Sequence, residues 1–223
     1  MTSRSSTRDR LIVAASELFA ERGFAATTAR DIAKRAGVNL AAAHYHYGSK
    51  KDLYLEVLRA QFADIALTLK ARGGSPSRAD LDRLDLAELR VLFHRRITVM
   101  LEHLIGPPPS LHGALMQREM TDPSQALPVI VNEFVQPMIE ETSRIVARLA
   151  PDLTAVELRR CVLSIVGQGV FYRLAMPVIL PVLGHDAYPE GFAPSLAEHI
   201  AEFSLGGIER VTTKRTTKRK RRA

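Results

Sequence analysis

Apolar residues recur every three or four positions along almost the whole chain, which is the spacing of helices with one buried face. The segment from Leu86 to Ile105 shows this spacing most clearly, and residues 50–69, 124–149 and 155–176 show it as well. No stretch alternates apolar and polar residues for long enough to make a strand. The pattern therefore predicts an all-α fold of nine or ten helices.

Capping and turn residues mark the boundaries of short helices near the N-terminus. Ser6 and Thr28 each stand three residues before an aspartate, which is the pattern of a capping box at a helix start. Gly23 and Gly37 suit helix ends, because glycine adopts a left-handed backbone without strain. Asn39 is then a favourable N-cap for the next helix. The sequence thus predicts two short helices joined by a tight turn, as in a helix-turn-helix.

The second of these helices, residues 40–47, reads LAAAHYHY and has almost no long apolar side chains to bury. A helix this short is unstable alone and must be held by its neighbours. Its small side chains allow close approach to a groove in DNA, and its rings offer hydrogen bonds to bases or phosphates. Ser49, three residues before Asp52, caps the helix that follows and places Lys50 near a phosphate. We therefore predict a DNA-reading element here.

This region resembles the N-terminal signature of the TetR family of bacterial one-component repressors. The likeness covers residues 7–58. It rests on Thr28, Ile32 and Ala33, on Ala36-Gly37-Val38, on Tyr45-His46-Tyr47 and on Ser49-Lys50. The resemblance implies an N-terminal three-helix helix-turn-helix DNA-binding domain and a larger C-terminal helical domain for ligand binding and dimerisation.

The remainder of the chain resembles the CecR-like subgroup of that family, whose members sense small molecules. The motifs are Gln117-Arg118-Glu119, Pro123-Ser124, Gln136-Pro137, Gly167-Gln168-Gly169, Phe171 and Pro177. The subgroup also favours the Val38-Asn39-x-Ala41-Ala42 pattern seen here. The chain departs from it at Ala43 and His44, where a larger aliphatic residue and an asparagine are typical. We therefore expect its operator to differ from those of its relatives.

Charge divides the chain into the same parts. Residues 1–58, the expected DNA-binding domain, hold nine Lys and Arg against six Asp and Glu. Residues 59–210, the expected effector-binding and dimerisation domain, hold 15 against 18, so they are mildly acidic and suit a domain that does not touch nucleic acid. Residues 211–223 hold seven basic residues and no acidic ones, which predicts a disordered tail that either adds phosphate contacts or is merely solvated.

The resemblance also implies which residues contact DNA. By motif position they are Thr28, Arg30, Leu40, Ala41, Ala42, His44, Tyr45, His46 and Lys50. Arg30 is the best candidate for reading a guanine, because a guanidinium matches the O6 and N7 acceptors; a plain surface charge is the alternative. Tyr45 and His46 are expected to hold phosphates, which position the helix without reading sequence.

The effector pocket is expected among helices of the larger domain, apolar with a few polar groups. Candidate apolar lining residues at helical spacing are Phe93, Met100, Leu104, Met116, Phe134, Met138, Phe171, Tyr172 and Met176. Candidate polar anchors are Gln117, Gln168 and Arg173. Any one of the apolar residues could instead belong to the core.

The resemblance places a homodimer interface on the last two long helices, roughly 155–176 and 196–208. These helices contain Gly167, Gly169, Gly206 and Gly207, which lower helix propensity but allow close approach of a second helix. The alternative is that the glycines pack only within one chain.

Other classes of function lack a motif. No nucleophile, base and orienting group stand at catalytic spacing, and no glycine-rich phosphate loop is visible, so we expect neither an enzyme nor a cofactor. His44 and His46 lie two apart on a helix and point in different directions, which disfavours a metal site. The single cysteine, Cys161, and the absence of an apolar leader or long apolar span predict a cytoplasmic protein.

We therefore predict a homodimeric, ligand-responsive transcriptional repressor that releases a near-palindromic DNA operator when a small molecule binds. The alternative is a sequence-tolerant architectural DNA binder that uses the basic tail.

Overall fold

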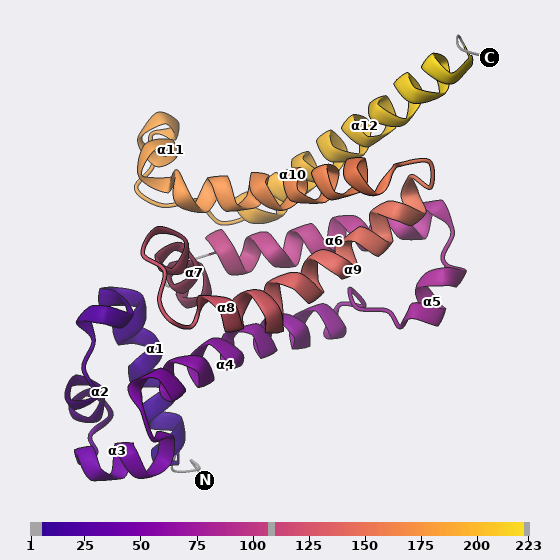
Figure 1. Ribbon diagram of the computed structural model, residues 1–223. Helices are drawn as coiled ribbons and strands as arrows, with labels where there is room; N and C mark the ends of the chain where they lie inside the picture. Colours follow the sequence, from indigo (N-terminus) through magenta and orange to yellow (C-terminus); the bar gives the residue numbers. More distant parts are fainter. Residues whose placement is uncertain (1–5, 107–109, 221–223) are drawn as a thin grey trace. The chain divides into compact units, whose positions relative to one another are not determined.

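The computed structural model describes residues 6–106 and 110–220, with the side chains of 214–220 excepted (Figure 1). All regular structure in this part of the chain is helical, which confirms the all-α prediction. The elements are α1 (Thr7–Ala26), α2 (Ala29–Ala36), α3 (Leu40–Tyr47), α4 (Lys50–Ala71), α5 (Arg78–Arg83), α6 (Leu86–Ile105), α7 (Leu111–Thr121), α8 (Leu127–Ile130), the π-helical turn η1 (Val131–Val135), α9 (Gln136–Leu149), α10 (Ala155–Leu174), α11 (Met176–Leu183) and α12 (Phe192–Lys220).

The chain packs as two compact units. Unit 1 holds the described residues up to Asp64 together with residues 110–134, and unit 2 holds residues 65–106 and those from Val135 onward. These units do not coincide with the domains expected from sequence, because α7 and α8 pack with the N-terminal helices. The helix α4 runs without interruption across the boundary.

The predicted caps form as expected. The Ser6 side chain accepts the N–H of Asp9 at the start of α1, and Thr28 accepts that of Asp31 at the start of α2. In each case the aspartate accepts the N–H of the capping residue in return. Gly23 has a φ of 80° and breaks the helical conformation within α1, where we predicted that the first helix would end.

A ring cluster forms part of the core of unit 1. Phe19 of α1, Phe24 after the break and Tyr54 of α4 pack together, with the Phe19 and Tyr54 ring centroids 4.7 Å apart. Aliphatic residues from several helices complete the core, among them Leu11, Leu18, Ile32, Leu53, Val57, Leu58, Leu115 and Ile130. This core supplies an apolar floor for α2 and α3.

Two polar side chains of α7 explain why it belongs to unit 1. Glu119 is buried and accepts a 2.7 Å hydrogen bond from the Tyr54 hydroxyl. Its other oxygen accepts the N–H of Ser124. Arg118 donates to the carbonyls of Ala20 and Glu21 at the end of α1. The Gln-Arg-Glu motif therefore has a structural role in fastening α7 to α1 and α4.

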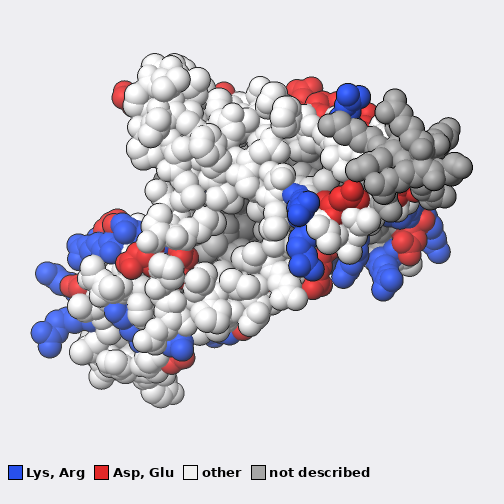
Figure 2. Space-filling view, turned by 45° about the horizontal axis from the view of Figure 1, so that its top comes forward, with Lys and Arg blue, Asp and Glu red and all other residues white. Residues whose placement is uncertain are grey.

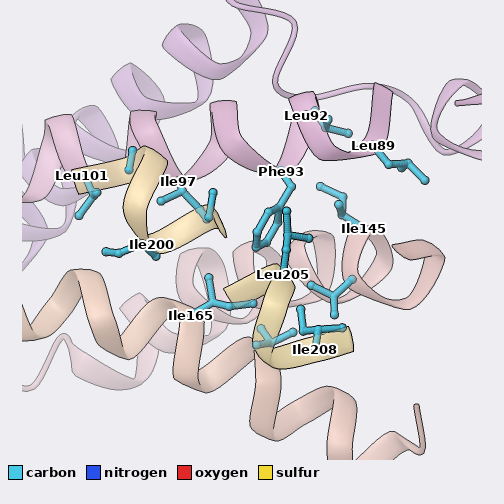
Figure 3. Packing of buried hydrophobic residues seen from close by; sticks show 14 of the residues in the cluster. Leu89, Leu92, Phe93, Ile97, Leu101, Ile145, Ile165, Ile200, Leu205 and Ile208 are labelled. Carbon is cyan, nitrogen blue, oxygen red and sulfur yellow. The ribbon is translucent and has the colours of Figure 1, made fainter. Parts of the chain in front are cut away.

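The core of unit 2 is built mainly by α6, α9, α10 and α12. Phe93, Ile97 and Leu101 of α6 lie against apolar residues of the other three helices (Figure 3). These include Ile145, Ile165, Ile200, Leu205 and Ile208. The strong apolar periodicity of residues 86–105 thus reflects a helix at the centre of this core.

The helix predicted over residues 124–149 is interrupted. The π-helical turn η1 separates α8 from α9 and ends two residues before Pro137. Proline lacks an N–H and its ring clashes with the carbonyl four residues earlier, so a regular α-helical turn is unfavourable there. A wider turn accommodates the ring.

The C-terminal region differs from the prediction. The last helix begins at Phe192 and continues through Lys220, so residues 211–220 form helix where we expected a disordered tail. Lys and Arg have favourable helix propensities, so such residues can extend a helix that is already nucleated. The last three residues of the predicted tail lie outside the described residues.

Replacing Tyr54 with phenylalanine should destabilise the protein. Burial, and then the hydrogen bond to Glu119, raise the pKa of Tyr54 well above its usual value, so the hydroxyl stays protonated and donates. Removing it leaves the buried carboxylate short of a donor, which should cost about 1–3 kcal/mol in urea denaturation. Tyr45→Phe, on a side chain that is 87% exposed, is the matched control. Equal midpoints for the two variants would contradict this role.

Candidate nucleic-acid interface

The turn between α2 and α3 is fixed by backbone hydrogen bonds. Gly37 has a φ of 66°, and its N–H donates to the carbonyls of Ala33 and Lys34. The N–H of Val38 donates to Ala33 at 3.0 Å. Asn39 then caps α3 by accepting the N–H of Ala42 at 2.7 Å. The start of the second helix is therefore set relative to the first by local geometry alone.

Two residues of α3 hold it against the rest of unit 1. Ala43 and Tyr47 are buried, and the Tyr47 hydroxyl donates to the carbonyl of Arg8 on α1 at 3.0 Å. Ala43 and Tyr47 are one helical turn apart, so they form one narrow buried edge. The small residue at position 43 lets α3 lie close to its support. The opposite side of the helix stays free.

The structure exposes most of the residues predicted to contact DNA. Ala41, His44, Tyr45 and His46 of α3 are exposed, as are Thr28 and Arg30 at the start of α2. Leu40, Ala42 and Lys50 are half-buried. The predicted residues are thus brought together on α2, on α3 and at the start of α4. Their contacts with DNA remain a prediction.

Arg30 is available for a new partner. Its guanidinium is exposed and makes no hydrogen bond or ion pair with any described residue. By contrast, Arg35 on the same helix is paired with Glu17 and Glu21 of α1. Arg10 donates to the carbonyl of Ala36. The neighbouring arginines therefore stabilise the fold, whereas Arg30 can turn toward DNA without breaking a hydrogen bond or an ion pair.

His44 is held in one orientation by the helix end. Its Nδ1 lies 2.8 Å from the carbonyl oxygen of Gly48. A carbonyl only accepts, so Nδ1 must carry the proton, and in the neutral ring Nε2 is then an acceptor. Gly48 has a φ of 67°, which glycine adopts readily. Sequence reasoning missed this role of Gly48, although a glycine directly after a helix was its signal.

Tyr45 and His46 project from α3. Their ring centroids are 5.4 Å apart in an edge contact, and Tyr45 is almost fully exposed. Both side chains end in groups that hydrogen-bond to phosphate oxygens.

Lys50 has a second role that the sequence did not indicate. Its ammonium donates to the carbonyls of Phe24 and Thr27 at 2.8 and 2.9 Å. It also lies 4.3 Å from the centroid of the Phe24 ring. The lysine thereby joins the start of α4 to the end of α1. An ammonium has three donors, so one remains for the predicted phosphate contact.

Charged side chains of both signs lie on the surface of unit 1. Lys and Arg side chains gather on the surface of unit 1, at the left of the view, with Asp and Glu among them (Figure 2). Several acids are already occupied: Asp31 and Asp52 each accept bonds from the cap in front of them, which lowers their pKa. The acidic groups near the predicted face therefore serve the helix caps.

The predicted effector residues are divided between the two units. Met116, Gln117 and Phe134 lie in unit 1, where Phe134 stacks on Phe62 with centroids 4.2 Å apart. The other nine lie in unit 2: Phe93, Met100, Leu104, Met138, Gln168, Phe171, Tyr172, Arg173 and Met176.

Within unit 2 these nine residues have different surroundings. Phe93 and Leu104 are buried in the core, and Phe171 is 58% exposed. Gln168 donates to the Ser204 hydroxyl. A cavity of about 30 Å³ elsewhere in this unit is lined by Arg96 and Glu141 but by none of the twelve. Their role in binding an effector stays a prediction.

The described residues were also compared with the requirements of a metal site and of a membrane span. No group of three or more His, Cys, Asp or Glu in them could hold a metal ion. No single helix in that part is long and apolar enough to cross a membrane. The helices α10 and α11, which meet at a bend of 73°, reach that length and apolar composition only when they are taken together.

A short helix held by a capped turn, with its outer face free, defines a helix-turn-helix regulator. Comparison with known protein families identifies the family of regulators. Residues 11–57 match the family of bacterial regulatory proteins named after tetR. Residues 88–208 match the C-terminal domain of the HTH-type transcriptional dual regulator CecR. The chain therefore belongs to the TetR family, with a CecR-like C-terminal domain; it is a DNA-binding transcriptional regulator and not an enzyme.

Individual proteins that resemble this chain are also transcriptional regulators. The chain is 29% identical to the dual regulator CecR of Shigella flexneri over 190 residues, which cover 82% of each protein. It is 39% identical over 83 residues to the transcriptional repressor KstR2 of Rhodococcus jostii, covering 36% of this chain and 41% of that one. A TetR-like regulator from Rhodococcus sp. RHA1 shares the fold, with a TM-score of 0.66 and 21% identity over 93% of this chain and all of that one.

Arg30→Ala should relax base preference at one operator position. Loss of a guanidinium that reads guanine should weaken binding to the preferred operator by about 1–3 kcal/mol and leave variants at that base pair almost unaffected. Fluorescence anisotropy with a set of single-base operator variants measures this. Lys34→Ala, an exposed cation on the same helix, should keep the ranking. If Arg30→Ala also preserves the ranking, Arg30 does not read sequence.

His44 should favour a base that donates a hydrogen bond. An Nε2 acceptor suits the amino groups of adenine and cytosine in the major groove. His44→Phe should reduce that preference by about 1 kcal/mol, roughly fivefold, in the same assay. His46→Phe is the control that should not change it. Two-bond ¹H–¹⁵N correlation spectra report the tautomer directly, and a proton on Nε2 would refute the argument.

Proposed function

We propose that the protein is a homodimeric transcriptional repressor that binds a near-palindromic operator and releases it when a small molecule binds the C-terminal domain. The observation that carries this proposal is the free outer face of α3 with the unpartnered guanidinium of Arg30 beside it. An ordered reading helix also favours this function over a sequence-tolerant architectural role for the basic C-terminal segment.

An exposed apolar stripe supports dimerisation. Val156, Leu163 and Phe171 of α10 are more than half exposed and lie on one side of that helix. Phe203 of α12 is 66% exposed, and α10 packs against α12. Contiguous apolar surface of this kind marks an interaction site.

The glycines on these helices divide into two groups. A side chain at Gly169 would meet Met100 at 2.7 Å, so this glycine serves packing within the chain. Gly167, Gly206 and Gly207 have no atom within 4 Å of the position that a Cβ would occupy. Packing within one chain therefore does not explain them. Close approach of a second copy does.

Two reading helices on one DNA duplex must enter successive major grooves, about 34–36 Å apart. A two-fold dimer meets this condition on an operator whose half-sites are inverted repeats. Ligand binding would favour dimers with a different spacing and so reduce operator affinity. The helix α4 belongs to both packing units and is our candidate for transmitting the change.

The name of one relative supports negative control, and a DNA operator would place the proposed action in the cytoplasm. KstR2 of Rhodococcus jostii is a repressor, and CecR of Shigella flexneri is a dual regulator. Selection of operators from a random DNA library, followed by anisotropy with and without candidate effectors, tests the proposal. An enriched inverted repeat that is released by ligand is the expected result. Ligand that tightens binding would overturn the release mechanism.

Phe203→Glu combined with Gly167→Glu should convert the dimer into a monomer. Both positions are exposed within one chain, so the substitutions should leave the fold intact while placing four charges in a dimer interface. Light scattering after size exclusion measures the mass, and operator affinity should fall with it. Val91→Glu, on an apolar residue of α6 that is 55% exposed, is the control. A double variant that stays dimeric would place the interface elsewhere.

A further inference from the structure

Arg173 stands on the inward face of α10. It follows Val162 by eleven residues, which on an α-helix places the two within about 20° of each other around the axis. Val162, Ile165 and Gly169 on this side are buried in unit 2. Phe171, on the opposite side, is exposed. Arg173 is therefore the charged member of a face that is otherwise apolar.

The guanidinium of Arg173 has no partner among the described residues. It is half-buried, and its Nε is fully buried without a hydrogen bond. Desolvation lowers its pKa. Two other arginines of unit 2 are compensated: Arg96, whose Nε is also buried without a hydrogen bond, pairs with Glu141 at 2.8 Å, and Arg148 donates to the carbonyls of Leu81 and Leu84. A half-buried cation without an opposite charge gains from meeting an anion, so Arg173 is a candidate anion anchor.

The surroundings of Arg173 are aromatic. Electrostatic interaction with Tyr188 partly opposes the lowering of the Arg173 pKa, and the Tyr188 ring stacks on Phe192 with centroids 4.5 Å apart. The Tyr188 hydroxyl donates its proton to the carbonyl of Tyr172 at 2.7 Å. Its oxygen can still accept a bond, but it carries no charge to offset the arginine. A partner for this region must therefore combine an acidic group with an apolar body.

We propose that Arg173 anchors the acid group of the effector and that the effector is an anionic amphiphile, a carboxylate or similar oxyanion on an aromatic or aliphatic body. The proposal rests on the ligand response proposed above and gives that ligand a chemical class. A guanidinium binds a carboxylate through two parallel hydrogen bonds, which fixes orientation as well as charge. The Tyr188–Phe192 stack would meet the apolar part.

A first experiment needs no ligand. Arg173→Met keeps the length of the stem and removes the uncompensated charge, so the unliganded dimer should melt several degrees higher than the wild type. Arg144→Met, on an exposed arginine of α9, should have little effect. A lower melting temperature for Arg173→Met would mean that the free protein already compensates the cation, for example through a carboxylate of a second copy. That result would overturn the proposal.

A second experiment uses matched acids and amides. 2-Naphthoate and decanoate should raise the melting temperature of the wild type, whereas 2-naphthamide and decanamide should not. Arg173→Gln should weaken binding of the acids by about 10- to 100-fold in calorimetry, because a hydrogen bond to a charged group is lost. Arg144→Gln should bind as the wild type does.

The outcomes separate this inference from the proposed function. If acids and amides bind equally, if Arg173→Gln retains acid binding, or if no acid at millimolar concentration shifts the wild type, Arg173 is not an anion anchor. If the acids bind through Arg173 but leave the operator complex intact in anisotropy, the anchor stands and the release mechanism fails. Failure to select any operator would count against the proposed function alone.

Discussion

An eight-residue helix does not persist in water by itself, and the architecture of unit 1 follows from this constraint. The helix α3 must be held firmly while most of its surface is left for another molecule. Ala43 and Tyr47 are its only buried residues, so nearly all of the support comes from elsewhere. The caps at Asn39 and Gly48, the turn at Gly37 and the core beneath α2 together supply it.

Some polar side chains of unit 1 hold its helices together, and others are exposed and free to bind another molecule. Lys50, Arg118 and Tyr47 all direct donors at backbone carbonyls of α1, and they do so from three different helices. These bonds tie the helices together without using the surface of α3. Arg30 and His46, in contrast, have no hydrogen bond to a described residue and stay exposed. A rigid support with free polar groups is what a pre-organised binding surface requires.

Local signals in the sequence predicted much of this unit correctly. The capping boxes at Ser6 and Thr28, the turn at Gly37 and the bounds of α3 all depend on residues within four positions of one another. The roles of Glu119 and Arg118 could not be read in this way, because their partners lie 65 and about 98 positions away. For the same reason the boundary between packing units was not visible from charge or composition.

Unit 2 shows what could not be predicted from helical periodicity. Helical periodicity identified α6 and α10, but it could not distinguish a residue that faces the core from one that faces a second copy or a ligand. Phe93, Phe171 and Tyr172 all fit one pattern, and the structure places them in the core, on the outside and at its edge. Only the three-dimensional surroundings separated Gly169 from Gly167, and Arg173 from the compensated arginines.

The π-helical turn before Pro137 has a consequence for the phase of the helix that follows. A π turn takes in about one residue more than an α turn, and each residue advances an α-helix by about 100°. Ile145 and Val146 of α9 are buried in the core of unit 2. Deletion of a single residue between positions 131 and 135 would shift the phase of α9 relative to the residues before it by about 100°. The length of this segment is therefore constrained independently of its composition.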